Sequence, residues 1–416
     1  MRFRQLAAAW AAVVLTACAT APTSSAQASL KVGALFPLTG PQAPLAKQEY
    51  AGVQIARDFV NADGGIDGVP INLVVKDLTT QSDAGRRVQE LKGEGVKAVV
   101  GAYSSNLSMA VSAAAQSRGI LYWEAGAVAD QLTGRGYPLV FRVGATGSNL
   151  GTMASHFAAE VLAPRLGKSP SSLRMVIVHN VDGYPSSVAT SVEQQAEREG
   201  IQVVASVVYD AHVPDWASVI NQVRAVQPDI LVLASYIADG VDFRRAMLRS
   251  GLHVDAFIGS TMAQCVPDFG ALLGADAIGV FAADRPPHGF NPDALTETGH
   301  AIYTRFAAAY RREYGTDPTE ESLAGFAAAW TLFHYVMPHA GDLSATAMAS
   351  AARGLDLPSG TLANGAGVKF ATSPDAMGQN VRASSVIWQW QGVRHSVTVY
   401  PPVFATGTPG FIPLPR

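Results

Sequence analysis

The chain has 416 residues, a formal net charge of −3 at pH 7, 48% hydrophobic residues and 15% charged residues. This length favours more than one domain, and the composition is sufficient for sizeable hydrophobic cores. No basic face is visible in the sequence, which argues against a nucleic-acid partner.

The N-terminal segment has the composition of an export signal. Two arginines precede an apolar run over 6–17, which is short for a membrane-spanning helix. The run ends in LTAC (15–18), which resembles the cleavage and lipidation site of bacterial lipoproteins. We therefore expect a lipoprotein signal peptide over 1–17, a lipid on Cys18, and a flexible polar tether over 18–29. The alternative is an ordinary signal peptide that contains an unrelated cysteine.

Strands and helices are predicted to alternate along the next part of the chain. The predicted strands cover 31–36, 70–76, 98–100, 120–123 and 138–143. The predicted helices cover 46–61, 82–94 and 106–117. After the first helix, the glycines of NADGGIDG (61–68) are typical of a helix stop and a turn.

The same alternation starts again near residue 173. Strands are predicted over 173–179, 203–208, 229–234 and 256–258, and helices over 186–199, 216–226 and 241–250. Two helical stretches, 296–314 and 320–336, and two strand-like runs, 386–390 and 397–400, follow them. Two successive β-α series predict an α/β protein with two mostly parallel sheets, each flanked by helices.

In such sheets, ligands bind beyond the carboxyl ends of the strands. Here these ends carry hydroxyl, amide or aromatic side chains. The segments are FPLTGP (36–41), GAYSSN (101–106), YWEAGAV (122–128), HNVDGYP (179–185), ASYIADG (234–240) and GSTMAQ (259–264). Glu124 lies at one of these ends, although a carboxylate is costly to bury without a partner. Two such lobes facing each other would form a cleft.

Sequence patterns of common enzyme sites are absent. There is no GxSxG, no GxxxxGK[ST], no GxGxxG after a strand and no HExxH. His334 and His339 flank Pro338 at a poor spacing for a metal pair, so we expect surface or helix-end roles for them. Glu320 and Glu321 stand at a predicted helix start, where the macrodipole favours acidic side chains. We therefore expect a binding protein, with no cofactor and no metal, rather than an enzyme.

Several segments resemble one family of solute-binding proteins. They are VGALFPLTGP (32–41), NADGGIDGVPINLVVKD (61–77), VVGAYSSN (99–106), LTGRGYPLVFRV (132–143) and AGFAAAWTL (324–332). Their sequence and order are similar to those of the leucine/isoleucine/valine-binding family, the type I periplasmic solute-binding proteins of ABC transporters. The likeness extends from about residue 30 to 402.

The resemblance implies a type I periplasmic-binding-protein fold, in which two lobes are joined by a three-strand hinge. The ligand then binds between the lobes, which close around it. The expected crossovers lie near 144–148, 281–286 and 367–371. The expected lobes are 30–146 plus 283–369, and 147–282 plus 370–416.

The resemblance also implies ligand-binding residues in the first lobe. Family members hold the ligand carboxylate with a serine after the third strand, which corresponds here to Ser105 with Ser104 beside it. Backbone groups of Gly126 and Ala127 correspond to further contacts. Both serines have a structural alternative, because either could cap the following helix.

In the second lobe, Tyr184 and Tyr236 match aromatic positions of the family's cleft. The family's acid for the ligand ammonium falls on Thr261, which is a departure from the pattern. The resemblance leaves Glu124 with two hypotheses. It either lines the cleft and accepts hydrogen bonds from a cationic or NH-bearing part of the ligand, or it pairs with Arg135 or caps a local turn. Its neighbour Trp123 is expected in the core.

The resemblance implies a lipid-anchored, extracytoplasmic, monomeric solute-binding protein. It would deliver an amino acid or a related small carboxylate or amide to the permease of an ABC importer. Membrane contact would be through the lipid anchor only. Two other functions remain open, a ligand sensor for a signalling partner and a secreted enzyme on a similar scaffold.

Overall fold

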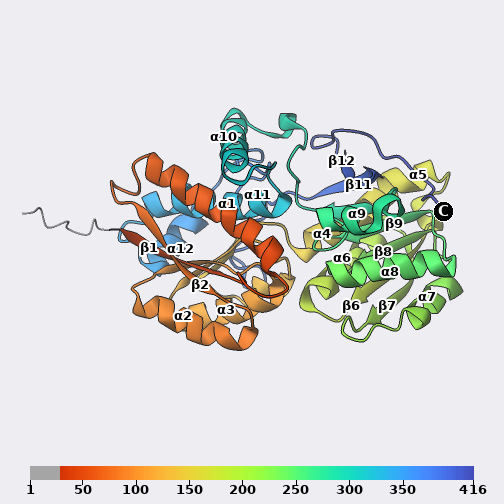
Figure 1. The fold of residues 1–416 in the computed structure, drawn as a ribbon, viewed down its shortest axis with the longest axis horizontal. Coiled ribbons are helices and arrows are strands. Elements are labelled where there is room, and N and C mark those ends of the chain that lie inside the picture. Colours follow the sequence, from red (N-terminus) through yellow and green to blue (C-terminus); the bar gives the residue numbers. More distant parts are fainter. Residues whose placement is uncertain (1–28) are drawn as a thin grey trace, which may run out of the picture.

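The structure of the protein is a computed structural model that describes residues 29–416. It contains two β-sheets, each covered by helices on both faces (Figure 1). The predicted signal peptide, Cys18 and the tether up to residue 28 lie outside the described residues. Over residues 29–416, every helix is too short or too polar to cross a membrane.

The first sheet has five parallel strands in the order β2-β1-β3-β4-β5. They are β1 (Leu30–Phe36), β2 (Ile71–Asp77), β3 (Ala98–Gly101), β4 (Leu121–Glu124) and β5 (Val140–Arg142). The part of the chain built around this sheet is called the first lobe below. Strands β3, β4 and β5 are buried along their whole length, as expected for a parallel sheet between two helical layers.

The second sheet has seven strands in the order β12-β11-β10-β9-β8-β6-β7, and the part of the chain around it is called the second lobe. Its strands are β6 (Arg174–Asn180), β7 (Gln202–Tyr209), β8 (Ile230–Ala234), β9 (Ala256–Ser260), β10 (Phe281–Asp284), β11 (Val386–Gly392) and β12 (His395–Tyr400). Strands β6 to β10 are parallel, and β11 and β12 add an antiparallel hairpin at one edge.

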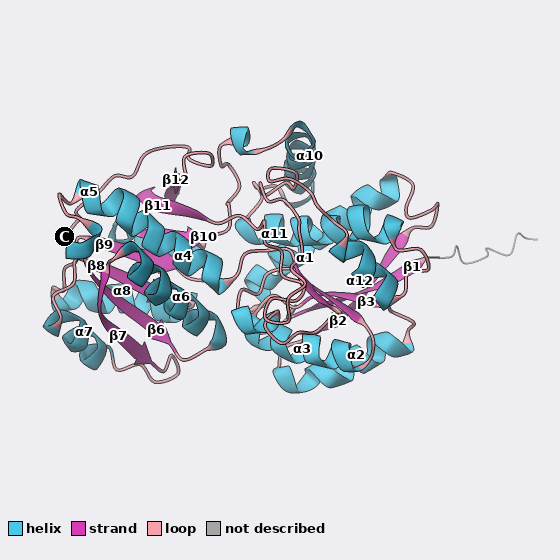
Figure 2. Cartoon of the chain, turned by 180° about the vertical axis from the view of Figure 1, so that it is seen from behind, coloured by secondary structure: helices cyan, strands magenta, loops and turns pink. Residues whose placement is uncertain are grey.

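Twelve α-helices accompany these strands within the described residues. They are α1 (Ala43–Ala62), α2 (Ala84–Gly93), α3 (Ser105–Ser117), α4 (Gly147–Phe157), α5 (Ala163–Arg165), α6 (Gly183–Glu199), α7 (Trp216–Ala225), α8 (Ile237–Ser250), α9 (Pro267–Leu273), α10 (Glu297–Tyr314), α11 (Glu320–Trp330) and α12 (Ala345–Arg353). Alternate strand residues face different helical layers. In the first lobe, α2 and α3 cover one face, and α1, α11 and α12 cover the other. In the second lobe, α4 and α6 lie on one face (Figure 2), and α7, α8 and α9 lie on the other.

Helices α1 and α11 approach each other at two glycines. A Cβ on Gly52 would lie 2.0 Å from the backbone oxygen of Ser322, and a Cβ on Gly325 would lie 2.0 Å from that of Glu49. Only glycine permits backbones this close. The crossing therefore brings the first turns of α11 beside Glu49.

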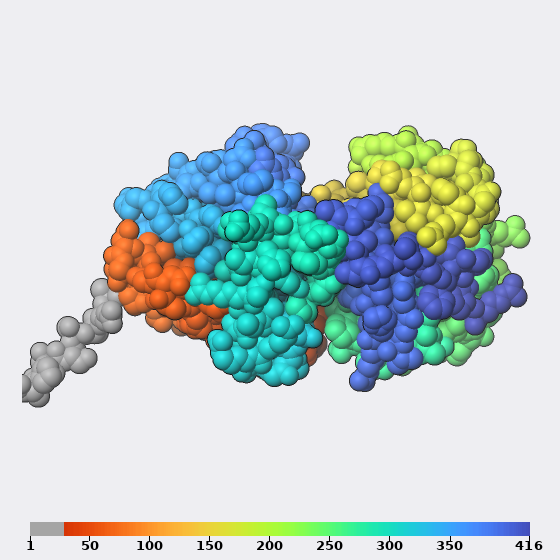
Figure 3. All heavy atoms as spheres, turned by 90° about the horizontal axis from the view of Figure 1, so that it is seen from above, coloured from red at the N-terminus to blue at the C-terminus, as the bar shows by residue number. Residues whose placement is uncertain are grey.

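Three crossovers connect the lobes. The chain leaves the first sheet after β5 and returns to the first lobe after β10. Before the third crossover, Phe370 packs against Trp123 and Phe141, and the backbone of Asn380 bonds to that of Arg142. The lobe boundaries remain a prediction, and these contacts would move the third one to after Asn380. Figure 3 shows the lobes as two masses that meet along one side and leave a notch between them.

The predicted fold class is confirmed, since both sheets are mostly parallel and flanked by helices. Five of these strands and α-helices were not predicted, namely α4, α5, α9, β10 and α12. Strand β10 is only four residues long, and its place is set by pairing with β9 and β11 rather than by its own pattern. The helix predicted over 320–336 is observed as α11 followed by a π-helical turn over 331–336.

Candidate functional site

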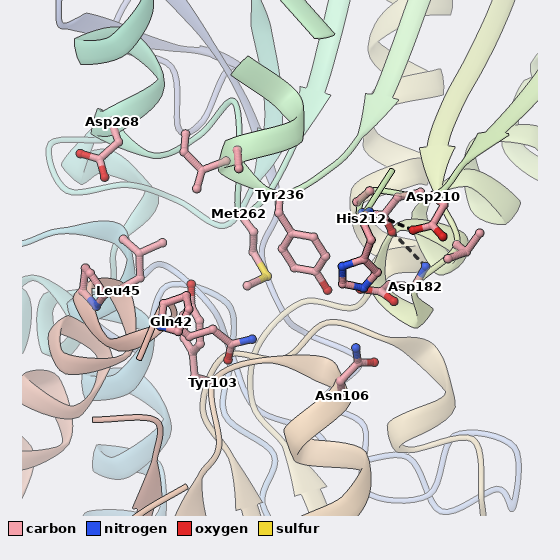
Figure 4. A pocket seen from close by; sticks show the side chains of 17 residues that line it. Gln42, Leu45, Tyr103, Asn106, Asp182, Asp210, His212, Tyr236, Met262 and Asp268 are labelled. Carbon is pink, nitrogen blue, oxygen red and sulfur yellow. Dashed lines mark hydrogen bonds between the residues drawn. The ribbon is translucent and has the colours of Figure 1, made fainter. Parts of the chain in front are cut away.

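A cavity of about 490 Å³ lies between the two lobes, at the carboxyl ends of their strands (Figure 4). One wall comes from the first lobe, from the segment around the start of α1 and the loop after β3. The other wall comes from the second lobe, from the loops after β6, β7, β8 and β9. Of the six strand-end segments identified in the sequence, all except 122–128 contribute lining residues. The cavity is therefore where the topology places a ligand site.

The cavity wall combines aromatic, apolar and polar side chains. Tyr103 from the first lobe faces Tyr236 and Met262 from the second lobe. Gln42 and Asn106 add amide groups on the first-lobe side. No lysine or arginine lines the cavity, whereas three aspartates do. This lining suits a small ligand with an apolar body and several hydrogen-bonding groups.

Two lining residues have strained backbone conformations. Tyr103 has φ +79° and Met262 has φ +64°, and both values lie in the left-handed region that non-glycine residues rarely adopt. Such strain persists where surrounding structure enforces it, and it concentrates at binding sites. Both residues follow the carboxyl end of a strand, so the strain coincides with the cavity wall.

The structure separates the roles of the two predicted serines. Ser104 is buried, and its hydroxyl makes no hydrogen bond to any described residue. It directly precedes α3 and directly follows the lining residue Tyr103. The Ser105 hydroxyl instead accepts a hydrogen bond from the Ala129 backbone N–H at 3.1 Å. Ser104 therefore keeps an unbonded hydroxyl among the described residues and Ser105 does not, and neither serine lines the cavity.

Glu124 is buried at the end of β4, where its carboxylate accepts four hydrogen bonds. Oε1 accepts the backbone N–H groups of Ala125, Gly126 and Ala127 at 3.0, 2.8 and 2.7 Å, and Oε2 accepts the Tyr122 hydroxyl at 2.7 Å. Burial raises the pKa of Glu124, and the Ser108 hydroxyl together with the Ala127, Tyr122 and Gly126 donors partly offsets the rise. This is the turn-capping arrangement that the sequence left open. The geometry gives no support to Glu124 as a ligand contact, because its acceptors are already occupied.

Arg142 holds the other side of the same loop. It is the β5 partner of Glu124, and its guanidinium donates to the Ala127 and Ala129 carbonyl oxygens at 3.1 and 2.7 Å. Burial lowers the pKa of Arg142 to about 10. The predicted contacts at Gly126 and Ala127 thus involve backbone groups that bond within the protein here, since the Gly126 oxygen also accepts from Arg285 at 3.1 Å.

Of the predicted second-lobe residues, Tyr236 lines the cavity and Tyr184 does not. The Tyr184 hydroxyl is fully buried, 2.9 Å from the Ser235 carbonyl oxygen and in contact with the Thr261 carbonyl oxygen. The Thr261 side chain is also fully buried, and its hydroxyl makes no hydrogen bond to a described residue. Its neighbour Met262 reaches the cavity instead. Ligand contact at Tyr184 or Thr261 stays a prediction that this arrangement does not favour.

A buried cluster of charges lies next to Tyr103. The Arg285 Nε lies 2.5 Å from Glu320 Oε1 and 3.6 Å from Asp284 Oδ1, and Nη2 lies 3.3 Å from Glu321 Oε2. Glu49 is fully buried beside them, and neither of its carboxylate oxygens makes a hydrogen bond to any residue within 29–416. Burial raises the pKa of Glu49, and the Glu321 and Glu124 carboxylates raise it further. Burial also raises the pKa of Glu321 to about 7, against the opposing effect of Arg285.

This cluster also influences the cavity wall. Burial raises the pKa of the Tyr103 hydroxyl, and the Glu321 and Glu49 carboxylates add to the rise. Cys265 is buried nearby, and burial followed by the Asp284 carboxylate raises the pKa of its thiol. Trp123 is likewise in the core, where its indole donates to the Ala328 carbonyl oxygen at 2.8 Å.

Several lining residues were not predicted as site residues. Tyr103, Asn106, Asp182 and Met262 all belong to the strand-end segments that the sequence identified, so position was the available signal. Gln42 lies one residue beyond the segment 36–41, and no strand-end segment was identified after the predicted strand 203–208. Gln42 and the loop over 210–212 therefore lacked that signal. Among residues 29–416, no group of three or more histidine, cysteine or acidic side chains has a metal-binding arrangement.

Comparison with known proteins identifies the family of this chain and finds the same fold in solved structures. A family model described as periplasmic binding protein matches residues 29–386. "Leu/Ile/Val-binding protein homolog 8" of Brucella abortus (strain 2308) is 33% identical over 382 residues, which cover 91% of this chain and 92% of that protein.

Two solved structures show the likeness of the fold. The LivJ substrate-binding protein of Streptococcus pneumoniae, solved with isoleucine, has a TM-score of 0.72 at 21% identity. The match covers 90% of this chain and 100% of LivJ. A solute-binding protein of Rhodopseudomonas palustris BisB5, solved with 3,4-dihydroxybenzoic acid, has a TM-score of 0.69 at 18% identity. That match covers 87% of this chain and 93% of the other.

Proposed function

Because the chain belongs to the periplasmic binding protein family, whose members bind solutes and are not enzymes, we propose that it supplies an ABC importer with a small carboxylate or amide. The favoured solute is an amino acid. The observation that supports this proposal is the cavity of about 490 Å³ between the lobes, lined from both sides. The family implies an extracytoplasmic location, and a monomer that docks on a membrane permease is part of the proposal.

The cavity wall supports a carboxylate-bearing solute. The free Ser104 hydroxyl lies at the start of α3, a 13-residue helix whose first N–H groups and dipole favour a negative charge. Tyr103 and Tyr236 approach from opposite lobes and offer aromatic faces to an apolar body. The named relatives support an amino acid, since one is called a Leu/Ile/Val-binding protein and another was solved with isoleucine.

A thermal-shift screen tests the function. The panel contains amino acids, amides, aliphatic acids and aromatic acids, and hits are confirmed by isothermal titration calorimetry. A ligand at 100 times its Kd stabilises the folded state by about 2.7 kcal/mol, so a true solute raises the Tm. Stoichiometric binding without turnover is the expected result. A panel without any hit, or chemical conversion of a bound solute, would contradict the proposal.

The lipid anchor is the second part of the proposal. Its support is the LTAC segment ending at Cys18, which follows an apolar run in the sequence. In a bacterial expression host, Cys18→Ala should leave the precursor unprocessed or release the protein from the membrane fraction. Normal cleavage together with unchanged membrane retention would exclude the anchor, and the solute-binding function would be unaffected.

A further inference from the structure

The C-terminal segment after β12 contains a loop that is fixed to the second lobe at both ends. Before the loop, the Tyr400 hydroxyl donates to the Glu160 carboxylate at 2.6 Å. After the loop, the Thr406 backbone N–H donates to the Thr398 carbonyl oxygen at 2.8 Å. The loop over 401–405 therefore projects from the second lobe between two anchors.

Phe404, in this loop, packs on residues outside the second lobe. Its ring centroid lies 5.4 Å from that of Phe290, and its carbonyl oxygen accepts the Asn291 backbone N–H at 3.0 Å. A Cβ on Gly365 would lie 2.4 Å from the Phe404 ring, so the ring lies directly on the Gly365 backbone. Phe404 is buried by these contacts, which are called the clasp below.

The residues that receive Phe404 belong to the first lobe. Phe290 also packs against Tyr303 of α10, with 5.5 Å between the ring centroids. Helix α10 is in turn held to α1 by an ion pair between Arg305 and Asp63 at 2.8 Å. The clasp is therefore a noncovalent contact between the lobes, in addition to the three covalent crossovers.

The clasp and the cavity lie on opposite sides of the crossovers. On the cavity side, Arg285 at the second crossover reaches the charged cluster next to Tyr103. On the clasp side, the backbone N–H of Gly367, two residues from Gly365, donates to the carbonyl oxygen of Arg382 at the third crossover. In Figure 1, α10 and β12 lie along the upper edge, whereas α3 and β6, whose ends carry cavity loops, lie along the lower edge. A rotation about the crossovers that narrows the cavity would therefore separate the two sides of the clasp.

We propose that the clasp opposes closure of the lobes, and that Phe404 is thereby a positioning residue for solute binding. This inference rests on the proposed function, because it concerns the affinity of the same cavity. Separation of Phe404 from Phe290 exposes apolar surface to water, so closure has a free-energy cost that solute binding must offset. A solute binds less tightly by the factor by which its binding-competent form is depleted. The clasp therefore keeps the affinity below the value that the cavity contacts alone would give.

Calorimetry with L-leucine, L-isoleucine and L-valine on the processed protein tests the clasp. Phe404→Ala should bind the probe that the wild type binds at least about threefold more tightly, because loss of the clasp shifts the lobes toward the closed form. In the absence of any probe, small-angle X-ray scattering should give Phe404→Ala a smaller radius of gyration than the wild type. A merely structural role would lower the Tm without tightening the binding.

Three further variants separate the clasp from general damage to the fold. Phe411→Ala is the matched control, since Phe411 lies in the same C-terminal segment but beside Gly279 of the second lobe, and it should change neither affinity nor radius. Phe290→Ala removes the first-lobe side of the clasp and should tighten binding as Phe404→Ala does, with little added effect in the double variant. Phe404→Leu keeps an apolar side chain, and its affinity should lie between those of the wild type and Phe404→Ala.

The outcomes separate this inference from the proposed function. Unchanged or weaker binding by the folded Phe404→Ala and Phe404→Leu variants would overturn the inference and leave the solute-binding function intact. Failure of all three probes to bind the wild type would count against an amino acid as the favoured solute. The scattering of the probe-free proteins then decides, and an unchanged radius of gyration in Phe404→Ala would overturn the inference.

Discussion

At the residue scale, Glu124 and Arg142 act as a pair that shapes one loop. They are neighbours in register on β4 and β5, and the loop over 125–129 lies between their bonds. Glu124 accepts the N–H groups of this loop, and Arg142 donates to its carbonyl groups. Buried charges are tolerated when every polar atom has a partner, and this loop supplies those partners.

This arrangement predicts the effect of Glu124→Gln. The free energy of unfolding without ligand should fall by about 1–3 kcal/mol, because hydrogen bonds to a charged acceptor become bonds to a neutral one. The affinity for the solute should stay within about threefold of wild type. Denaturant unfolding and calorimetry measure the two effects. A stable variant with lost affinity would instead support Glu124 as a ligand contact.

The adjacent serines provide a second prediction at this scale. Ser104→Ala should weaken solute binding by about 1–1.5 kcal/mol and leave the Tm of the free protein nearly unchanged, since its hydroxyl has no partner in the described part of the chain. Ser105→Ala is the matched control and should do the reverse, because it leaves the Ala129 N–H without an acceptor. Equal losses of affinity in both variants would contradict this division of roles.

At the element scale, the crossing of α1 and α11 positions the charges behind the cavity. Gly52 and Gly325 allow the close approach, which sets Glu49 against the first turn of α11. Arg285, directly after β10, inserts its guanidinium between the acids of α11 and the loop after β4. The second crossover is thereby tied to the first lobe through one side chain.

The crossing predicts that Gly52→Ala is destabilising. The added Cβ would lie 2.0 Å from the Ser322 backbone oxygen, so α1 must move away from α11. The free energy of unfolding of this variant, measured in urea, should fall by about 1–3 kcal/mol. Gly93→Ala in α2 is the control, because no atom lies within 4 Å of its added Cβ. The free energy of unfolding of the control should be unchanged or higher by about 0.5–1 kcal/mol. Equal decreases in both variants would contradict the close contact of α1 and α11 at Gly52.

The buried acids predict a pH effect on stability. Folding raises the pKa of Glu49, and it raises that of Glu321 from 4.5 to about 7. The folded state therefore holds more protons than the unfolded state between about pH 4.5 and 7, and this contribution to stability decreases as the pH rises through that window. Glu49→Gln removes one carboxylate, so its Tm relative to wild type should increase from pH 5 to pH 8.

The exposed Glu297, at the start of α10, supplies the control for this pH series. Glu297→Gln should show a difference in Tm from wild type that does not change with pH in this way. A constant difference for Glu49→Gln as well would show that Glu49 is not held protonated in the folded protein.

At the scale of the whole molecule, the cavity lies where two lobes can close. The lobes are built on separate sheets and are joined by only three crossovers, and the cavity is lined from both. Closure would bring the first-lobe and second-lobe walls of the cavity closer together. Hinge motions of this kind need few changes outside the connecting segments.

Closure predicts a smaller radius of gyration with bound solute. Small-angle X-ray scattering on the free and saturated protein measures it, with a non-binding compound from the screen as the control. A decrease is expected because the lobes rotate toward each other as rigid bodies. An unchanged scattering curve at full saturation would exclude closure from an open form.

The sequence by itself determined the fold class and most of the strands and helices, because buried parallel strands and amphipathic helices have strong local patterns. It also identified the strand ends that form the cavity, since chain order in a parallel sheet fixes which edge they share. The sequence did not predict the short strand β10. Its position depends on pairing with β9 and β11 rather than on a local sequence pattern.

Only the tertiary structure decided which side chains reach the cavity. Alternation along a strand end does not show whether Glu124 turns into the cleft or back onto its own loop, and the bonds from Ala125 to Ala127 decided that. Asn106 and Asp182 come from different lobes, and both line the cavity only because the two lobes are placed face to face. The charges of a site depend on partners that are distant in sequence, and local patterns carry no information about them.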